Sequence, residues 1–343
     1  MSDMSGNRNR TLKNPSVFIS KPIPEVIVSL LKEHGFEVKV NNTSHKLSKS
    51  ALIDACQQAD YLLNVGMSAL DKEFLQACKH LKGIALCSVG FDHIDLETAS
   101  QYNIPVSNTP DVLSKATADT AFLLLLSVSR KSYFRSREIE RGEWKNFEYM
   151  HQLGRDIQGD TLGIFGLGRI GFEMAKMARA AYGMRIIYHN RSRNPEAEDK
   201  LEAEYVSFEE LLKRSDVISV HTNLTPDTQY RFDKVAFSKM KKNAIFINTA
   251  RGKIHNETDL TKALIDKEIW GAGLDVTDPE PMLPDNPLLQ MSNVCVLPHI
   301  GSATLETRTA MAEMAVRNLI AVSKNEQMPQ IINKEFYSKS GAL

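Results

Sequence analysis

The sequence predicts an α/β protein built from two domains, each with a parallel sheet. The chain has 343 residues, which is too long for one ordinary hydrophobic core and suits domains of ~150 residues each. Short β-rich runs alternate with helical runs in two separate stretches, 15–106 and 161–298. Such alternation is typical of parallel strands joined by crossover helices. We expect a cleft between the two domains.

The first stretch, 15–106, begins after a polar segment. Residues 1–14 lack the apolar region of a secretory signal, so we expect them to form a disordered tail. Helical runs such as 25–34 and 72–80 separate the β-rich runs of this stretch. These β-rich runs are SVFIS, FEVKV, YLLNV, GIALC and IPV.

The second stretch, 161–298, repeats the pattern with longer strands, and helices such as 259–270 lie between them. Its strand runs are TLGIF, RIIYH, VISVHT, AIFINTA, GAGLDV and VCVLP. A final helix over about 303–324 should return to pack on the first domain. We therefore expect two domains, one of residues 15–108 with 300–343 and one of residues 109–299.

A long helix is expected between the two stretches, over about 114–141. Its most apolar part, 121–128, is far shorter than the ~20 residues needed to span a bilayer, so it should be buried. Because this helix is too long for a simple connector, we predict that it joins the domains. The region 114–150 is also the predicted contact of a homodimer.

The balance of charge argues against a nucleic-acid or membrane partner. Lysine plus arginine and aspartate plus glutamate both total 42, so no net field would recruit a polyanion or an anionic membrane. A small molecule is the better candidate. The four cysteines are scattered without a C-x-x-C pair, which favours reduced thiols in a cytoplasmic protein over disulfides or a zinc site. They are Cys56, Cys78, Cys87 and Cys295.

A glycine-rich turn follows the first strand of the second stretch. Gly166, Gly168 and Gly171 form the pattern G-x-G-x-x-G between the apolar run 161–165 and the amphipathic run 170–182. In this context the turn predicts a dinucleotide site, with the pyrophosphate at the helix N-terminus. Gly166 would permit the tight turn, Gly168 the approach of the pyrophosphate, and Gly171 the packing of helix on strand. A purely structural turn is the alternative.

Three polar residues stand at the ends of later strand runs. Arg251 follows AIFINTA, Glu280 lies in the loop after GLDV, and His299 follows VCVLP. The carboxyl ends of parallel strands meet at the edge where open α/β sheets bind ligands. Reduction of a 2-keto acid by a nicotinamide needs a cation for the carboxylate and a proton donor for the ketone oxygen. Arg251 suits the first role and His299 the second, with Glu280 holding the imidazole charged.

Each of these residues has an ordinary structural alternative. A lone arginine is usually a surface charge, a lone histidine is usually only hydrogen-bonded, and the segment 278–281 could be an exposed turn. The three together, after a dinucleotide turn, favour catalysis. His93 could suggest a metal site, but no second histidine stands at ligand spacing and hydride transfer needs no metal, so we expect none.

Six blocks of the sequence resemble the D-isomer-specific 2-hydroxyacid dehydrogenases. The resemblance runs from about residue 15 to residue 329, and the blocks occur in the order of that family. Among its subgroups the chain is most similar to the glyoxylate/hydroxypyruvate reductases. The resemblance implies a flavodoxin-like substrate domain beside a Rossmann-like dinucleotide-binding domain. The blocks are SVGFDHID (88–95), NTPDVLSKATAD (108–119), TLGIFGLGRIG (161–171), FINTARG (246–252), GLDVTDPEP (273–281) and VLPHIGSAT (296–304).

The resemblance also implies residue roles. Arg251, Glu280 and His299 would form the catalytic triad, and the backbone N–H groups of Val89 and Gly90 would hold the substrate carboxylate. Substrate binding would thus use these two N–H groups together with Arg251, His299 and Ser302.

Further implied roles concern residues around the triad. Asp275 would contact the nicotinamide side of the cofactor, and Ser302 would lie near the substrate oxygen. Trp144 would approach the active site of a neighbouring subunit. Two positions depart from the family pattern, because Asp111 stands where glycine is common and Asn223 where proline is common. Asn223 lies beside the cofactor in the family and could add a polar contact.

The residues after the run RIIYH, the second strand of the predicted dinucleotide-binding domain, favour NADPH as the cofactor. NAD sites place an acid about 20 residues past the glycines, whereas here the segment reads Asn190, Arg191, Ser192, Arg193. One arginine ~4 Å from the 2′-phosphate contributes about 4 kcal/mol before screening, and even ~2 to 3 kcal/mol gives roughly a thirty- to hundredfold preference. A solvated turn that tolerates NADH as well is the alternative. The predicted cofactor-binding residues are Gly166, Leu167, Gly168, Arg169, Ile170, Gly171, Asn190, Arg191, Ser192, Arg193, Asn223, Thr249, Arg251, Asp275, His299 and Gly301.

The leading hypothesis is an NADPH-dependent reductase of glyoxylate and hydroxypyruvate. The residues themselves reach only as far as a small 2-keto acid, and the narrower substrate comes from the resemblance. An NAD-dependent enzyme acting on 3-phosphoglycerate or D-lactate is an alternative, although we expect the roughly forty residues after His299 to be too few for an appended regulatory domain. A dinucleotide-sensing scaffold similar to the corepressors of this fold is the alternative from another class.

Overall fold

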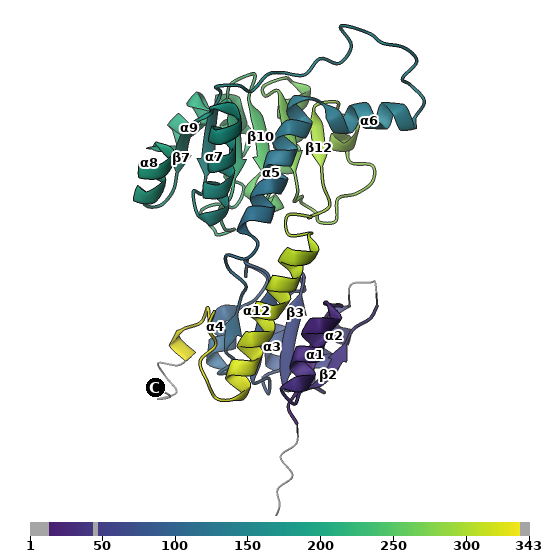
Figure 1. Cartoon of the computed structure of the whole chain (residues 1–343), viewed down its shortest axis with the longest axis vertical. Helices are drawn as coiled ribbons and strands as arrows, with labels where there is room; N and C mark the ends of the chain where they lie inside the picture. The colour runs from purple at the N-terminus through teal and green to yellow at the C-terminus, as the bar shows by residue number, and fades with distance from the viewer. Residues whose placement is uncertain (1–13, 44–46, 337–343) are drawn as a thin grey trace, which may run out of the picture. The chain divides into compact units, whose positions relative to one another are not determined.

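The computed structural model describes residues 14–43 and 47–336, so all but the last residue of the predicted tail lies outside the described residues. The chain divides into two compact units (Figure 1). The first unit takes residues up to Pro110 and from Arg308 onward, and the second takes Asp111–Thr307. Within the described residues, none of the helices combines the length and the apolar character that a membrane crossing requires.

The first unit contains a five-stranded parallel sheet. The order β2-β1-β3-β4-β5 is that of a flavodoxin-like, doubly wound sheet, so the predicted parallel α/β architecture is confirmed. The strands are β1 (Ser16–Ile19), β2 (Glu37–Val40), β3 (Tyr61–Val65), β4 (Gly83–Cys87) and β5 (Val106–Ser107).

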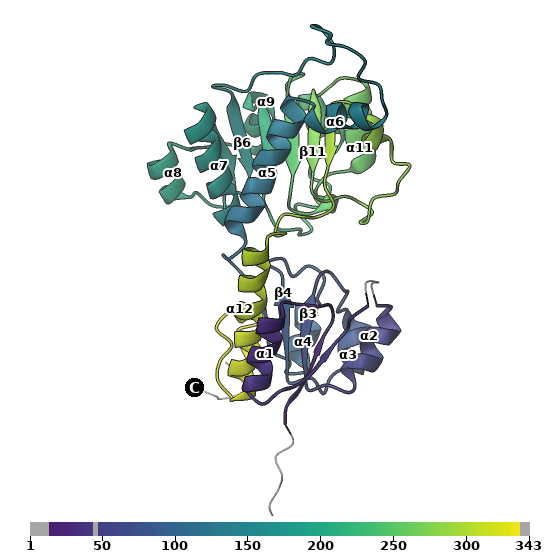
Figure 2. The same ribbon diagram turned by 45° about the vertical axis from the view of Figure 1, so that its right-hand side comes forward.

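Helices cover both faces of this sheet (Figure 2). On one face lie α1 (Glu25–Glu33) and α12 (Leu305–Ser323), whose Ala312 and Val316 pack with Val17 and Ile19. The prediction that the final helix returns to this sheet is therefore confirmed. The other face is covered by α2 (Lys49–Cys56), α3 (Lys72–Ala77) and α4 (Leu96–Gln101).

The second unit contains a seven-stranded parallel sheet in the order β12-β11-β10-β9-β6-β7-β8. The strand order reverses between β6 and β9, and ligands of open α/β sheets bind outside the carboxyl ends at this point. The two-residue edge strand β8 was not predicted, because it is too short to show a pattern. The strands are β6 (Thr161–Phe165), β7 (Arg185–His189), β8 (Glu204–Tyr205), β9 (Val217–Val220), β10 (Ile245–Asn248), β11 (Gly271–Leu274) and β12 (Val294–Val296).

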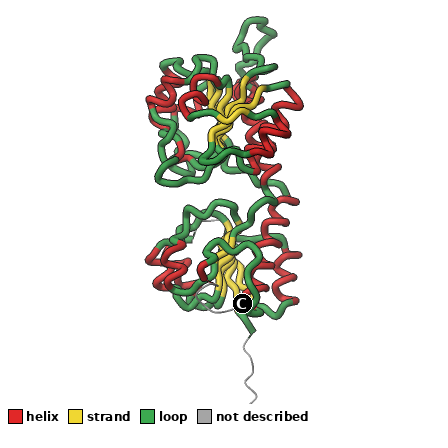
Figure 3. The backbone as a smooth tube through the Cα atoms, turned by 90° about the vertical axis from the view of Figure 1, so that its left-hand side faces the viewer, coloured by secondary structure: helices red, strands yellow, loops and turns green. Residues whose placement is uncertain are grey.

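The strands of each unit lie between layers of helices (Figure 3). In the second unit α5 (Ser114–Ser129) and α7 (Arg169–Tyr182) form one apolar core with the sheet. The opposite core holds Leu211, Phe237 and Leu260, which come from three further helices. These are α9 (Phe208–Arg214), α10 (Lys234–Lys239) and α11 (Glu257–Ile265), while α8 (Pro195–Leu201) leads to the edge strand.

Two predicted helices differ from the observed ones. The helix expected over 114–141 is broken into α5 and α6 (Ser132–Glu140), because the Ser129 carbonyl accepts a hydrogen bond from the N–H of Arg155 at 2.8 Å and Lys131 adopts φ 52°. The helix expected over 259–270 is α11, which starts earlier, where Asn256 caps it, and stops before Lys267 at φ 57°.

Close packing requires two of the glycines in the turn after β6. Gly166 has φ 98°, and a Cβ there would lie 2.7 Å from the backbone nitrogen of Thr222. A Cβ at Gly171 would lie 2.8 Å from the Gly166 oxygen and 2.9 Å from Ile164 Cγ2. At Gly168 a Cβ would meet no described atom within 4 Å. The turn predicted at Gly166 has the positive φ that glycine permits, and the predicted close packing of helix on strand at Gly171 is observed.

We expect Gly171→Ala to lower the free energy of unfolding by about 1 to 3 kcal/mol, because the added methyl group meets a backbone carbonyl that cannot rotate away. Urea unfolding of both proteins measures this difference. Gly168→Ala is the matched control and should change stability by less than about 0.5 kcal/mol. Equal midpoints for wild type and Gly171→Ala would contradict the packing argument.

Candidate active site

Three adjacent strands carry the predicted triad at their carboxyl ends. Arg251 follows β10, Glu280 lies in the loop after β11, and His299 follows β12. All three residues belong to the second unit. Each of the three strands is a short, largely buried run, and the polar residue lies in the loop that follows it. The three side chains thus lie in loops at the carboxyl edge of the sheet.

His299 and Glu280 are directly hydrogen-bonded. The imidazole Nδ1 lies 2.6 Å from Glu280 Oε1. Burial acts to raise the pKa of Glu280, but the hydrogen bond and charge of His299 and the charge of Arg251 outweigh it, so the net pKa lies below its usual value. An ionised carboxylate only accepts hydrogen bonds, so Nδ1–H donates to Glu280. The second ring nitrogen, Nε2, remains for another partner.

The turn that carries Arg251 is held by its own backbone neighbours. The Arg251 guanidinium donates to the Ala250 carbonyl at 2.7 Å, and the side chain of Asn248 bonds both the Ala250 N–H and the Arg251 carbonyl at 2.9 Å. The next residue, Gly252, lies against the loop after β11, since a Cβ there would be 2.0 Å from the Thr277 oxygen. Only glycine permits this approach, which brings the Arg251 turn against the loop that leads to Glu280.

Glu257, in the first turn of α11, holds that loop from the other side. Its carboxylate accepts hydrogen bonds from the Asp278 N–H at 3.0 Å and from Asn286 Nδ2 at 2.6 Å. Thr277 donates to the Pro279 carbonyl at 2.8 Å, which ties the loop to itself. The segment bearing Glu280 is therefore attached at both ends to fixed structure.

Asp275 organises the turn that carries His299. The side chain is 1% exposed, and its two oxygens accept the N–H groups of Ile300 and Gly301 at 2.7 and 2.8 Å. Burial raises the pKa of Asp275, and the two N–H groups only partly offset this. His299 itself has φ 54°, a conformation unfavourable for a residue with a side chain. Asp275 thus holds the backbone directly after His299, the residue in the unfavourable conformation.

The glycine turn after β6 leads straight into α7, with Gly168 at the N-cap. The neighbouring strand braces it, because Leu167 N–H donates to Asn190 Oδ1 at 2.6 Å and Asn190 Nδ2 donates to the Leu167 carbonyl at 3.2 Å. Arg169, the first residue of the helix, forms an ion pair with Asp111. The helix N-terminus therefore presents free N–H groups and an exposed guanidinium, which is the arrangement an anionic ligand needs.

The four residues predicted to recognise the 2′-phosphate have different surroundings. Asn190 is engaged with Leu167, as described. The Arg193 guanidinium makes two hydrogen bonds to Glu198, at 2.9 and 2.8 Å. Arg191 and Ser192 are exposed, and no partner of the Arg191 guanidinium occurs among the described residues. Of the two arginines, Arg191 is the one available to a ligand.

The remaining predicted cofactor residues lie after β9, after β10 and in the turn after β12. Thr249 Oγ1 is 3.4 Å from Nδ1 of His221, whose Nε2 is 2.8 Å from Ser219 Oγ. Burial lowers the pKa of His221 to about 3, so this ring stays neutral. Asn223 is exposed, and Gly301 is held by Asp275.

The first unit holds the predicted carboxylate-binding backbone. The Val89 carbonyl accepts Asn108 Nδ2 at 2.8 Å, and the Gly90 carbonyl accepts the Ser88 hydroxyl at 2.8 Å. These bonds hold a loop in which the N–H groups of Val89 and Gly90 have no partner among the described residues. In the second unit, Ser302 is half-buried and follows Gly301 directly.

Comparison with known proteins identifies the family. The model described as "D-isomer specific 2-hydroxyacid dehydrogenase, NAD binding domain" matches residues 122–301. The chain belongs to the D-isomer specific 2-hydroxyacid dehydrogenase family. It is therefore an oxidoreductase, and its second unit carries a nicotinamide-cofactor domain.

Similar proteins cover nearly the whole dehydrogenase chain. This chain is 43% identical over 330 residues to a glyoxylate reductase of Thermococcus litoralis. The matched region covers 95% of this chain and 99% of that one. A solved structure of a Thermus thermophilus protein has 42% identity and a TM-score of 0.86, covering 92% of this chain and 99% of that one. The NADPH-dependent glyoxylate/hydroxypyruvate reductase of Sinorhizobium meliloti, solved with NADP and malonate, has 29% identity and a TM-score of 0.81, covering 93% and 97%.

The structure adds supporting residues that motif analysis of the dehydrogenase did not find. Asn248 and Glu257 connect segments through side chain to backbone bonds. Nothing in the sequence distinguishes them, because an asparagine at a strand end and an acid in the first turn of a helix are both common. The bonds of Asp275 to Ile300 and Gly301 span 25 and 26 residues and were equally invisible.

We expect Asp275→Asn to lower the free energy of unfolding by about 1 to 3 kcal/mol, because the amide NH₂ would face a backbone N–H that then has no acceptor. The displaced turn should also lower kcat of the dehydrogenase. Asp233→Asn is a matched control, since Asp233 accepts a single backbone N–H, from Ala236 at 2.9 Å. Denaturant unfolding and steady-state rates measure both effects, and equal losses in the two variants would refute the special role of Asp275.

Proposed function

We propose that the dehydrogenase reduces glyoxylate to glycolate and hydroxypyruvate to D-glycerate, with NADPH as the preferred reductant. The observation that carries the proposal is the 2.6 Å hydrogen bond between His299 and Glu280. Together with Arg251 it supplies an acid, its charged partner and a carboxylate-binding cation on adjacent strand ends. The glyoxylate reductase named among the relatives supports the choice of substrate.

In this proposal the protein's groups bind and protonate the keto acid. Arg251 pairs with the carboxylate through its planar guanidinium, and in the first unit the free N–H groups of Val89 and Gly90 are suited to a carboxylate. Glu280 holds His299 through Nδ1–H, so Nε2 can donate its proton to the oxygen that gains negative charge. The nicotinamide, when bound, supplies the hydride. Asp275 supports the His299 turn, and we assign Ser302 to a place near the substrate oxygen.

The residues of the second unit fit a bound dinucleotide. Gly168 leaves open space at the N-terminus of α7, and the N–H groups there can hold the pyrophosphate. Leu167, Arg169 and Ile170 lie in the same turn, Asn223 follows β9 at the switch point, and Thr249 follows the adjacent strand β10. The exposed guanidinium of Arg191 and the absence of an acid at position 190 favour a 2′-phosphate. The Sinorhizobium meliloti relative, which was solved with NADP, supports this assignment.

Initial-rate assays test the reaction directly. Purified protein is supplied with NADPH or NADH and with glyoxylate, hydroxypyruvate or pyruvate, and loss of nicotinamide absorbance is followed. We expect rapid oxidation of NADPH with the first two acids and a kcat/KM at least tenfold lower with NADH. Turnover of 3-phosphoglycerate or D-lactate alone would replace the substrate assignment. Tight dinucleotide binding without turnover of any 2-keto acid would favour a sensing role.

Two arginine variants serve as controls for the cofactor preference. Arg191→Asp should raise KM for NADPH about tenfold or more, because a carboxylate would face the phosphate, while KM for NADH stays similar. Arg193→Gln should have a smaller effect, since Arg193 is already paired with Glu198. If Arg191→Asp binds NADPH more tightly, the assignment is wrong.

The loop after α6 supports the proposed homodimer. It carries Trp144, Phe147, Tyr149 and Met150 with exposed fractions of 63, 85, 79 and 70%. In Figure 1 it leaves α6 and runs away from the sheet. Such a group of large apolar side chains is typical of a protein contact. We assign this contact to a second copy of the chain, with Trp144 directed toward the partner subunit.

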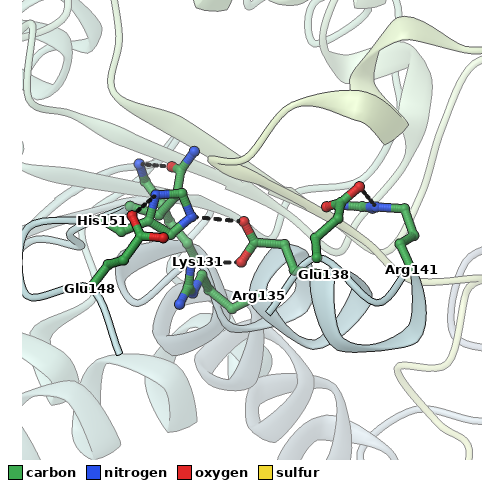
Figure 4. Close-up of polar contacts among 8 residues, drawn as sticks. Lys131, Arg135, Glu138, Arg141, Glu148 and His151 are labelled. Carbon is green, nitrogen blue, oxygen red and sulfur yellow. Dashed lines mark hydrogen bonds and ion pairs between the residues drawn. The ribbon is translucent and has the colours of Figure 1, made fainter. Parts of the chain in front are cut away.

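Glu138 of α6 connects the helix to this loop (Figure 4). Its carboxylate, 7% exposed, pairs with Arg135 at 2.6 Å and accepts from His151 Nε2 at 3.1 Å. Lys131 donates to Gln152 at 2.9 Å. The base of the loop is therefore held in one conformation, which lowers the entropy that a partner would otherwise have to remove.

We expect Phe147→Asp to shift the protein from dimer to monomer at micromolar concentration, because a carboxylate would be buried without a partner in the contact. Light scattering after size-exclusion chromatography measures the mass. Val235→Asp, at an equally apolar but separate exposed position on α10, should leave the dimer intact. A wild-type protein that is monomeric at all concentrations would contradict the assignment.

A further inference from the structure

Asn248 is buried at the end of β10 and makes three hydrogen bonds through its side chain. It is 0% exposed. Its Oδ1 accepts the Ala250 N–H at 2.9 Å, and its Nδ2 donates to the Arg251 carbonyl at 2.9 Å. The same Nδ2 lies 3.0 Å from Nδ1 of His255. The amide therefore holds the backbone before and after the Arg251 side chain, and its own second N–H points to a histidine.

The orientation of this amide follows from its partners. If the amide were turned by 180°, its oxygen would face the Arg251 carbonyl and its NH₂ would face the Ala250 N–H, and both bonds would be lost. In the observed orientation both N–H groups of Nδ2 need acceptors, since an unpaired buried donor is costly. The Arg251 carbonyl takes one, and His255 Nδ1 takes the other. His255 must then carry its proton on Nε2.

His255 is suited to remain an acceptor at all working pH values. The ring is 0% exposed and lies with its edge against Phe246, with the ring centroids 5.6 Å apart. Burial lowers the pKa of His255 to about 3, so the imidazole stays neutral. Its Nε2 is buried and has no hydrogen-bond partner among the described residues. A leucine or phenylalanine would avoid the unpaired Nε2, but it would leave the second N–H of Asn248 without an acceptor.

We infer that His255 is a positioning residue for Arg251: by accepting from Asn248 Nδ2 it locks the amide that holds the Arg251 backbone, and so sets how firmly the guanidinium holds a substrate carboxylate. This inference rests on the carboxylate-binding role proposed for Arg251. His255 touches no reacting atom and acts only through Asn248. Its removal should therefore weaken binding of carboxylate ligands while leaving the cofactor turn, on another strand, unaffected.

Two substitutions of His255 separate the acceptor from the packing. His255→Phe keeps a ring against Phe246 but cannot accept a hydrogen bond, whereas His255→Gln offers a carbonyl that can. We expect His255→Phe to raise KM for glyoxylate about three- to tenfold, the value of one lost buried hydrogen bond, with kcat changed less than twofold. His255→Gln should recover most of the loss. The Kd for NADPH, measured by fluorescence titration, should rise less than KM for glyoxylate does in His255→Phe, because the glycine turn that would hold the pyrophosphate follows a different strand.

A control variant identifies a merely structural effect. Phe237→Leu removes volume from the same core, where Phe237 packs on Phe246, without touching Asn248. It should lower the unfolding midpoint and leave KM unchanged. If Phe237→Leu and His255→Phe raise KM equally, or if His255→Phe behaves like wild type, the inference is overturned. Should His255→Phe not fold, Asn248→Asp replaces it, because its second oxygen would face the Arg251 carbonyl and His255 Nδ1, and the same rise in KM is expected.

Binding of oxalate, an unreactive dicarboxylate, separates the inference from the proposed function. Calorimetric titration of the protein saturated with NADPH gives a Kd that needs no turnover. Oxalate affinity that falls three- to tenfold in His255→Phe supports the inference even if wild type reduces none of the keto acids, an outcome that overturns only the proposed function. Wild type that neither turns over nor binds oxalate overturns both.

Discussion

The geometry of the active site depends on one buried carboxylate, that of Asp275. Its two oxygens accept the N–H groups of Ile300 and Gly301, and the residue before them, His299, is held at φ 54°. A left-handed residue with a side chain costs of order 1 kcal/mol and persists only where the surroundings determine it. In this conformation the imidazole Nδ1 lies 2.6 Å from Glu280 Oε1. Without the carboxylate acceptor, the turn would relax and the proton donor would lose its partner.

The other two members of the triad are also held in place by contacts from neighbouring segments. Arg251, Glu280 and His299 lie on separate loops, and a loop alone does not hold a side chain to the accuracy that catalysis needs. The structure compensates by joining the loops to one another. Gly252 allows the Arg251 turn to touch the backbone of Thr277, and Glu257 bonds the Asp278 N–H just before Glu280. The charge of Arg251 then contributes to the low pKa of Glu280, which keeps that carboxylate ionised.

Structural features that depend on residues close together in the chain were predicted from the sequence. Features that depend on hydrogen bonds between residues far apart in the chain were not. The strands and the packing of Gly166 and Gly171 follow from local patterns of apolar residues and glycine. The break between α5 and α6 was missed, because the N–H that takes the Ser129 carbonyl belongs to Arg155, 26 positions away. The four residues 190–193 were predicted to bind the 2′-phosphate together, but two of them have partners within the protein. Asn190 serves the glycine turn and Arg193 serves Glu198, which only the fold reveals.

Asp111 illustrates how a departure from the family pattern is accommodated. The residue common at this position is glycine, and Asp111 has φ 75°, a conformation that glycine adopts without cost. Aspartate is one of the few other residues that tolerate it, because its short side chain bonds locally. In this chain the carboxylate pairs with Arg169 at the N-terminus of α7, where a negative charge is also favoured by the helix dipole. The interaction occupies the arginine nearest the glycine turn, so a bound pyrophosphate and Asp111 would compete for one guanidinium.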